Sequence, residues 1–334
     1  RRNALPHLRQ ILPGFRARRM NILVTAAFLI LTLLVVPLIS YFFGTPLGPL
    51  EQLALQALVW IYLGAWITCF VLGEWTGNVS QVDKVWSLLP IVYAWVVAAY
   101  GDYSPRLLLM AGLVTVWGLR LTWNFSRHGA YRLKFWSGHE DYRWQVLREK
   151  PEFQAGWKWT LFNLLFISGY QNLLIMLMTL PTLVALQFND APLGVMDYLA
   201  AAAMLFLIIF ETVADNQQWR FQQAKRALVE SGRPLTGPYA GGFVHTGLWA
   251  RSRHPNYFAE QGIWIAFYFF SVAASGQWIN WSVSGCLLLV ILFRGSSSFS
   301  EEISAGKYPE YADYQQAVPR FIPIGRKYRQ QSPQ

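Results

Sequence analysis

The feature of the sequence that most constrains its fold is a series of apolar runs, each about 20 residues long. The hydrocarbon core of a bilayer, about 30 Å thick, is crossed by a helix of roughly 20 mainly apolar residues. We predict eight spans, at 21–43, 52–73, 84–100, 105–124, 159–180, 195–214, 257–275 and 278–294. Only 14% of the residues are charged, against about 25% in soluble proteins. The sequence therefore predicts an all-α, polytopic membrane bundle.

The distribution of Lys and Arg predicts how the bundle is oriented. With eight spans and a cytoplasmic N-terminus, 27 of the 28 Lys and Arg residues fall on the cytoplasmic side, and only Arg106 lies outside. This asymmetry is the positive-inside pattern. We therefore expect both termini, the long loops 125–158 and 215–256, and the tail after 294 to be cytoplasmic. The pattern suits a bacterial inner membrane, and it would also suit the endoplasmic reticulum.

Several classes of site are not supported by the sequence. Cys69 and Cys286 are the only cysteines, both inside apolar runs and without a CxxC pair, so neither a disulfide framework nor a zinc site is expected. The segment 231–247 is rich in Gly and Pro but contains no GxGxxG, so it reads as a loop and not as a dinucleotide-binding turn. Basic and aromatic residues alternate in 120–144, but they adjoin a span, which favours an interfacial belt over a nucleic-acid surface.

The segment ARSRHPNYFAEQ, residues 250–261, places a cationic cluster directly before an apolar run. The cluster consists of Arg251, Arg253 and His254. Pro255 suits the first turn of a helix, whose free N–H groups favour a phosphate. The alternative is a basic anchor that only fixes topology. Three further residues, Asn256, Tyr257 and Glu260, favour a binding site, because an ionisable group within a span is costly and usually functional.

Two other segments carry candidate polar residues. Glu211 and Asp215 share a helix face that Gln218 continues, and they could bind ribose hydroxyls or pair with arginines. In 120–144, Asn124, Arg127 and Arg143 accompany aromatic residues that could stack on a planar ring, with the arginines on its phosphates. In the tail, Tyr308, Tyr311 and Tyr314 are spaced three apart and predict one aromatic face that packs on another part of the protein.

Together these stretches resemble the steroid 5-alpha-reductase and sterol reductase superfamily, and in particular its bacterial steroid 5-alpha-reductase-like membrane enzymes. The resemblance rests on GLWARSRHPNYFAE, the tail EE…KYPEYADYQQAVPRFIP, and the shorter QVDKVWSLLP, LTWNFSRHG and HEDYRW. It covers about residues 75–325. We accordingly expect a leader with two spans at 1–75 and a reductase-like membrane domain at 76–334. A wider group shares the RHPxY turn and the tail, namely isoprenylcysteine carboxyl methyltransferases and phospholipid N-methyltransferases, which bind S-adenosylmethionine.

The resemblance implies NADPH as the cofactor, held on the cytoplasmic side. Residues that match its cofactor-binding positions are Arg251, Arg253, His254, Asn256 and Tyr257 in the RHPNY element, with Asp215, Arg226, Arg127, Tyr308 and Tyr311 elsewhere. Steroid reductases polarise the substrate ketone with a Tyr supported by a Glu in an early span. This chain has Asn124 where the Tyr is expected, with Asp83 or Glu74 in place of the Glu, which argues against a steroid substrate.

These features predict an NADPH-dependent reductase of a lipophilic, conjugated carbon–carbon double bond. The catalytic candidates are Asn124, Asp83 and Glu211, and Arg143 and Glu260 join the cofactor-binding set. Substrate is expected to enter from the bilayer, and neither a metal nor a nucleic acid is expected to take part. The alternatives are a methyltransferase that uses S-adenosylmethionine on a lipid or prenylcysteine, and a membrane protein that binds lipid without catalysis.

Overall fold

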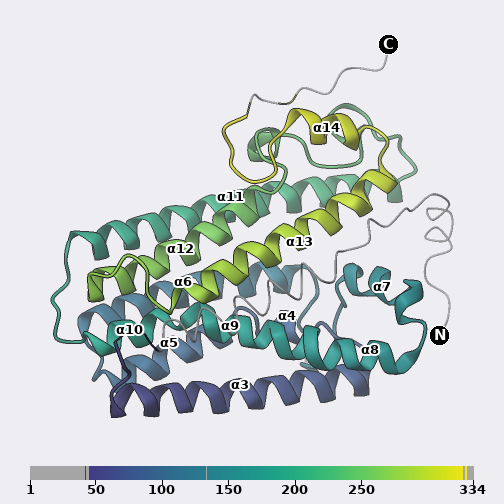
Figure 1. The fold of residues 1–334 in the computed structure, drawn as a ribbon. Helices are drawn as coiled ribbons and strands as arrows, with labels where there is room; N and C mark the ends of the chain where they lie inside the picture. The colour runs from purple at the N-terminus through teal and green to yellow at the C-terminus, as the bar shows by residue number, and fades with distance from the viewer. Residues whose placement is uncertain (1–41, 43–44, 133, 326–327, 329–334) are drawn as a thin grey trace. The chain divides into compact units, whose positions relative to one another are not determined.

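The computed structural model describes residue 42 and residues 45–132, 134–325 and 328, and every regular element in this part of the chain is helical. The α-helices are α3 (Pro49–Thr76), α4 (Gln81–Val85), α5 (Leu89–Tyr100), α6 (Pro105–Arg127), α7 (Tyr142–Arg148), α8 (Gly156–Phe162), α9 (Gln171–Thr179), α10 (Pro181–Gln187), α11 (Val195–Glu230), α12 (Pro255–Ser275), α13 (Val283–Lys307) and α14 (Tyr311–Ala317). A π-helix, η4 (Asn163–Tyr170), joins α8 to α9. The all-α prediction is confirmed (Figure 1).

Five helical segments are long and apolar enough to cross a membrane. They are Pro49–Thr76, Pro105–Arg127, Gly156–Gln187, Val195–Glu230 and Val283–Lys307. The first four each contain one of the predicted spans, whereas Val283–Lys307 begins five residues after the start of the predicted span 278–294 and extends beyond its end. α5 is a shorter apolar helix, and α12 covers the predicted span at 257–275. Apart from Phe42, the first predicted span lies outside the described residues. The number of eight spans and the cytoplasmic termini remain predictions.

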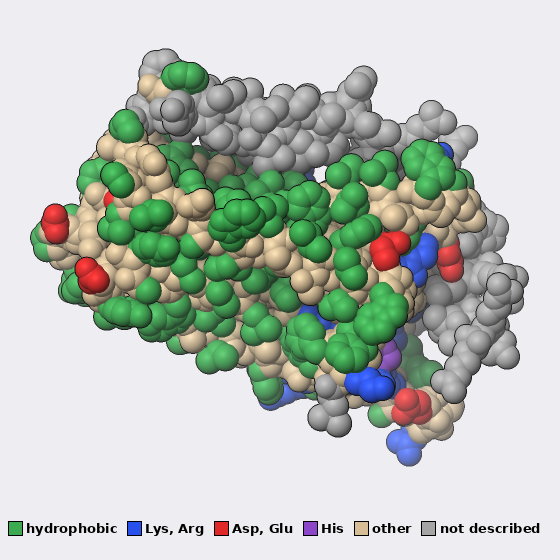
Figure 2. Space-filling view, turned by 90° about the horizontal axis from the view of Figure 1, so that it is seen from below, with side chains coloured by type: hydrophobic (Ala, Val, Ile, Leu, Met, Phe, Trp, Pro, Cys, Tyr) green, Lys and Arg blue, Asp and Glu red, His purple; other side chains and the backbone are tan. Residues whose placement is uncertain are grey.

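The surface of α3 is apolar, as expected of a helix in contact with lipid. Trp60, Ile67 and Val71 are each more than half exposed. On the face drawn in Figure 2, hydrophobic side chains predominate, and acidic and basic side chains gather toward its ends. Lipid tails are themselves apolar, so exposed side chains of this kind carry no cost in a bilayer. This surface supports an integral membrane protein.

The described residues divide into two compact units. Unit 2 contains 45–208 and 261–290, and unit 1 contains 209–260 and the chain from Ile291 onward. In unit 2, α3, α5, α9 and α10 pack on one another and α6 packs on α5 (Figure 1). Trp117 of α6 packs edge-on against Trp264 of α12, with their ring centroids 4.9 Å apart.

A buried ion pair accounts for Arg106, the one basic residue predicted on the outer side. Its Nε lies 2.8 Å from Asp197 Oδ1, and both side chains are almost fully buried. The same guanidinium donates to the carbonyls of Ala191 and Pro192. Arg106 therefore holds the segment before α11 to the start of α6, which explains why it departs from the positive-inside pattern.

The core of unit 1 is aromatic and confirms the face predicted in the tail. Tyr311 and Tyr314 of α14 are buried against Phe243, with Tyr308 packed beside them. The hydroxyl of Tyr314 donates to the carbonyl of Trp249. α14 thus lies against the loop 231–254, a position that Figure 1 also shows.

Candidate functional site

Three buried carboxylates mark the part of unit 1 where α11 and α12 contribute polar residues. Glu211, Asp215 and Glu260 are 4, 9 and 4% exposed, respectively. α11 is continuous from Val195 to Glu230, so Glu211 and Asp215 lie one helical turn apart on one face, as predicted. Asn256, the second residue of α12, donates through Nδ2 to Asp215 Oδ1 at 3.3 Å. The structure therefore brings together the predicted residues of α11 and of the RHPNY element.

Arg253 and His254 share a single buried partner that the sequence did not assign to the site, Glu301 of α13. Arg253 Nε lies 2.8 Å from Glu301 Oε1, and His254 Nε2 lies 2.9 Å from the same oxygen. Glu301 is only 2% exposed. Burial lowers the pKa of His254 below its usual value; Arg253 and Arg320 add to this effect, and Glu301 opposes it.

The remaining donors of Arg253 hold the tail. Its Nη1 donates to the carbonyls of Gln315 and Val318, at 2.6 and 2.5 Å. The backbone N–H groups of Arg253 and His254 donate to the carbonyls of Pro319 and Arg320, both at 3.0 Å. The guanidinium is thus held by a carboxylate and two carbonyls through four hydrogen bonds. Its position is that of an internal clamp between α12, α13 and the tail.

The tyrosines of the predicted cofactor set are in aromatic contacts. Tyr257 stacks on His254, with ring centroids 5.1 Å apart, and also packs on Phe293. Tyr308 accepts a hydrogen bond from Lys225 Nζ at 2.7 Å. It also lies over Gly242, where φ is +73° and an added Cβ would stand 2.5 Å from the ring. Only glycine combines that backbone angle with such a close approach. Tyr311 is buried in the aromatic core described above.

Two of the predicted arginines lie on the surface of unit 1. Arg251 and Arg226 are exposed, and neither has an ion-pair partner within the described chain. Arg251 lies two residues before Arg253, and Arg226 lies after Asp215 on α11. These two cations differ from Arg253 in being accessible to an anion from solvent.

In unit 2 the structure pairs Asn124 with Arg127 at the end of α6. Asn124 Oδ1 accepts from Arg127 Nε at 2.9 Å, and the guanidinium lies over the Trp123 ring, 4.6 Å from its centroid. The amide oxygen of Asn124 therefore orients the guanidinium. A cation stacked on Trp is a stabilised arrangement.

Asp83 lies in a second polar cluster of unit 2, between α4 and the start of α7. Trp144 Nε1 donates to Asp83 Oδ2 at 3.1 Å. Burial raises the pKa of Asp83 above its usual range, and Asp141 adds to the effect. Burial alone would also raise the pKa of Asp141, but the charge and hydrogen bonds of Arg143 outweigh it and hold that pKa below its usual value. The Asp83 carboxyl thus favours its protonated form, and the Asp141 carboxyl favours its ionised form.

Lys84 anchors this cluster and was not predicted as a site residue. It is fully buried. Its Nζ donates to the carbonyls of Phe135 and Ser137 at 2.8 and 2.9 Å, and to Gln81 at 3.2 Å. The sequence signal that could have identified it is a lysine inside QVDKVW, directly before an apolar run. No group of three or more His, Cys, Asp and Glu side chains in the described part of the chain is arranged to hold a metal ion.

Comparison with known proteins identifies the family. The family model described as "Protein of unknown function (DUF1295)" matches residues 69–318. This range includes the buried carboxylates of unit 1 and the Asp83 cluster of unit 2. An uncharacterized protein of Schizosaccharomyces pombe is 38% identical over 272 residues, which cover 76% of this chain and 77% of the relative. No solved structure matches the chain significantly. The resemblance to the steroid 5-alpha-reductase-like superfamily is confirmed, since DUF1295 is one of its families, while membership of a bacterial branch stays a prediction. The chain belongs to the DUF1295 family of membrane proteins.

Proposed function

We propose that this protein is a membrane-embedded, NADPH-dependent reductase of a conjugated carbon–carbon double bond in a lipophilic substrate. The main support is the hydrogen bond between Asp215 and Asn256, which joins α11 to the RHPNY element at the start of α12. Carboxylate and amide groups of this kind accept from and donate to ribose hydroxyls. The accessible arginines of the same unit, Arg251 and Arg226, supply the charge that phosphates require.

The residues fit a phosphorylated dinucleotide by the chemistry of their donors and acceptors. NADPH supplies a hydride when bound. In this proposal Asp215 and Asn256 orient the ribose, while Arg251 and Arg226 pair with the phosphates. The contacts of Arg253 and His254 with Glu301 hold the start of α12 in position. Asn124, Asp83 and Glu211 are the candidates for donating a hydrogen bond or proton to the substrate, and Asp83 is the one whose raised pKa favours the protonated form.

A second candidate function is methyl transfer from S-adenosylmethionine. The three buried carboxylates Glu211, Asp215 and Glu260 favour it, because the sulfonium of that cofactor is cationic. A third candidate is lipid binding without catalysis. Buried ionisable residues within a membrane helix argue against that role, since they are costly and usually functional. The predicted orientation suits a bacterial inner membrane, which we propose as the location.

The phosphate contact is tested by titrating detergent-purified protein with NADPH and with NADH. We expect Arg251→Ala to raise the Kd for NADPH about tenfold or more, since a hydrogen bond to a charged group contributes about 1.5–3 kcal/mol. Arg233→Ala, which removes an exposed cation from the loop 231–254, is the matched control and should leave the Kd unchanged. If both variants bind as the wild type does, Arg251 is a topological anchor. If the wild type binds neither nucleotide, the proposal fails.

A further inference from the structure

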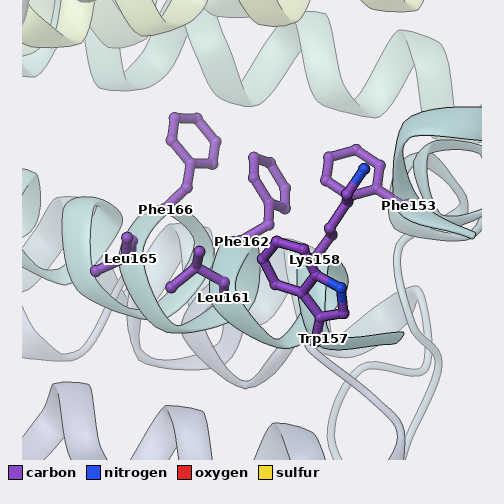
Figure 3. A pocket seen from close by; sticks show the side chains of 7 residues that line it. All are labelled: Phe153, Trp157, Lys158, Leu161, Phe162, Leu165 and Phe166. Atoms are coloured by element: carbon purple, nitrogen blue, oxygen red, sulfur yellow. The ribbon is translucent and has the colours of Figure 1, made fainter. Parts of the chain in front are cut away.

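An apolar groove runs along one side of α8 and η4, within unit 2. Figure 3 shows the rings of Phe153, Phe162 and Phe166 standing side by side along one wall, and Leu161 and Leu165 along the other. The ring centroids of Phe162 and Phe166 are 5.0 Å apart with an angle of 18° between the ring planes. Those of Phe153 and Phe162 are 4.8 Å apart. The wall is therefore a continuous row of aromatic rings, in which the Phe153 ring is tilted by 46° from that of Phe162.

The groove has a polar group at one end only. Of its lining residues, Lys158 alone carries a charge, and it is exposed. Trp157 lies beside it, with the amino group 5.8 Å from the Trp ring centroid and the ring 67% exposed. Arg143 and Arg148, which precede the groove, are paired with Asp141 and Glu140, so Lys158 is the cation of the groove itself. A Trp and a Lys at the end of a membrane helix are typical of the headgroup level of a bilayer.

The length of the groove matches one leaflet. From Trp157 to Phe166 a helix rises about 14 Å, at about 1.5 Å per residue, and half of the hydrocarbon core is about 15 Å. Gly156–Gln187 is one of the five segments able to cross the membrane, and the groove occupies its first part. The positive-inside pattern puts this end on the cytoplasmic side.

We propose that this groove is a binding site for one anionic phospholipid of the cytoplasmic leaflet. The lipid phosphate pairs with Lys158, and one acyl chain lies between the aromatic wall and the leucines. A single exposed cation at the mouth of an apolar channel one leaflet deep complements a lipid that has a charged head and an apolar tail. The site does not depend on the proposed reductase activity, because none of its residues belongs to the candidate cofactor set.

The proposal is tested by tryptophan quenching with brominated lipids. The full-length protein is reconstituted in phosphatidylcholine vesicles that contain a small fraction of either brominated phosphatidylglycerol or brominated phosphatidylcholine. The contribution of Trp157 is isolated as the difference between wild type and Trp157→Phe. We expect brominated phosphatidylglycerol to quench this contribution several-fold more effectively than brominated phosphatidylcholine.

Variants separate the headgroup contact from general lipid exposure. Lys158→Gln should abolish the preference for phosphatidylglycerol, and Lys158→Arg should keep it. Lys307→Gln, which removes an exposed cation from α13 of unit 1, is the matched control and should also keep it. Leu161→Phe should fill the groove without adding a tryptophan, and should reduce quenching while Lys158 is intact. Equal quenching by the two lipids in the wild type would overturn the proposal and leave only non-selective contact. Quenching by neither would overturn it too, because a protein segment or a second copy of the chain would then cover the groove.

Discussion

At the scale of single residues, the contacts of Arg253 decide between two roles for the RHPNY arginine. Removing its guanidinium leaves the Glu301 carboxylate buried without its nearest cation. We expect Arg253→Ala to lower the free energy of unfolding in detergent by about 3–5 kcal/mol, the usual cost of breaking a buried pair. Arg320→Ala is the control, because Arg320 lies 3.5 Å from the same carboxylate but is 30% exposed. Its loss should cost less than about 1 kcal/mol. Equal losses in the two variants would contradict the clamp.

His254 gives the clamp a pH dependence. Its folded-state pKa is below the unfolded value of 6.5, chiefly because of burial. The neutral form of His254 is thus favoured in the folded protein. Its contribution to the free energy of unfolding is fully present above pH 6.5 and is lost as the pH falls through the folded-state pKa. We expect the melting temperature to fall more steeply from pH 7 to pH 5 in the wild type than in His254→Gln, whose amide still donates to Glu301. Identical slopes would show that His254 does not titrate in this range.

For the contacts of Arg253 and His254, the sequence indicated these two residues but not their partner. Sequence reasoning singled out Arg253 and His254 because charges next to an apolar run are conspicuous, and it noticed Glu301 only as part of a polar tail. Glu301 lies 48 residues after Arg253, and no local pattern reports a pairing at that separation. Lys84 was missed for the same reason, since its carbonyl partners are about 50 residues away.

At the scale of elements, Lys84 determines how the segment 129–141 is held against α4. The segment has little regular structure, and Arg132 and Lys134 within it are exposed. Lys84→Met keeps the aliphatic stem and removes the donors to the carbonyls of Phe135 and Ser137. Each such hydrogen bond contributes about 1.5–3 kcal/mol. We therefore expect trypsin to cleave the segment about tenfold faster or more, because it opens locally more often. Lys307→Met should leave the rate unchanged, and an unchanged rate in Lys84→Met would contradict the anchoring role.

The elements themselves were predictable to different degrees. The five membrane-length helical segments were indicated by apolar run length, and the tail face by three tyrosines spaced three apart. α9 ends at Thr179 and α10 begins at Pro181, because proline cannot donate the backbone hydrogen bond that would continue the helix. The π-helix η4 was not predictable. Its wider turn is accompanied by long-range contacts, since Glu74 accepts from Asn163 and Trp66 donates to the Leu164 carbonyl. Such contacts leave no periodic signal in the sequence.

At the scale of the whole molecule, the eight-span topology is tested by cysteine labelling. Cys69 and Cys286 are both buried, so the background from native cysteines is low. We expect Arg233→Cys to react with a membrane-impermeant maleimide only after the cells are opened. Asp190→Cys should react in intact cells, because an exposed residue between the fifth and sixth predicted spans lies outside. The reverse pattern, or labelling of both from the same side, would refute the topology.

Equilibrium binding of NADPH and S-adenosylmethionine to the purified protein in detergent distinguishes a reductase from a methyltransferase. The proposed reductase binds NADPH saturably, binds NADH more weakly, and does not release NADPH when S-adenosylmethionine is added. Saturable binding of S-adenosylmethionine with no binding of NADPH would contradict the account and would assign the buried carboxylates of α11 and α12 to a methyl donor.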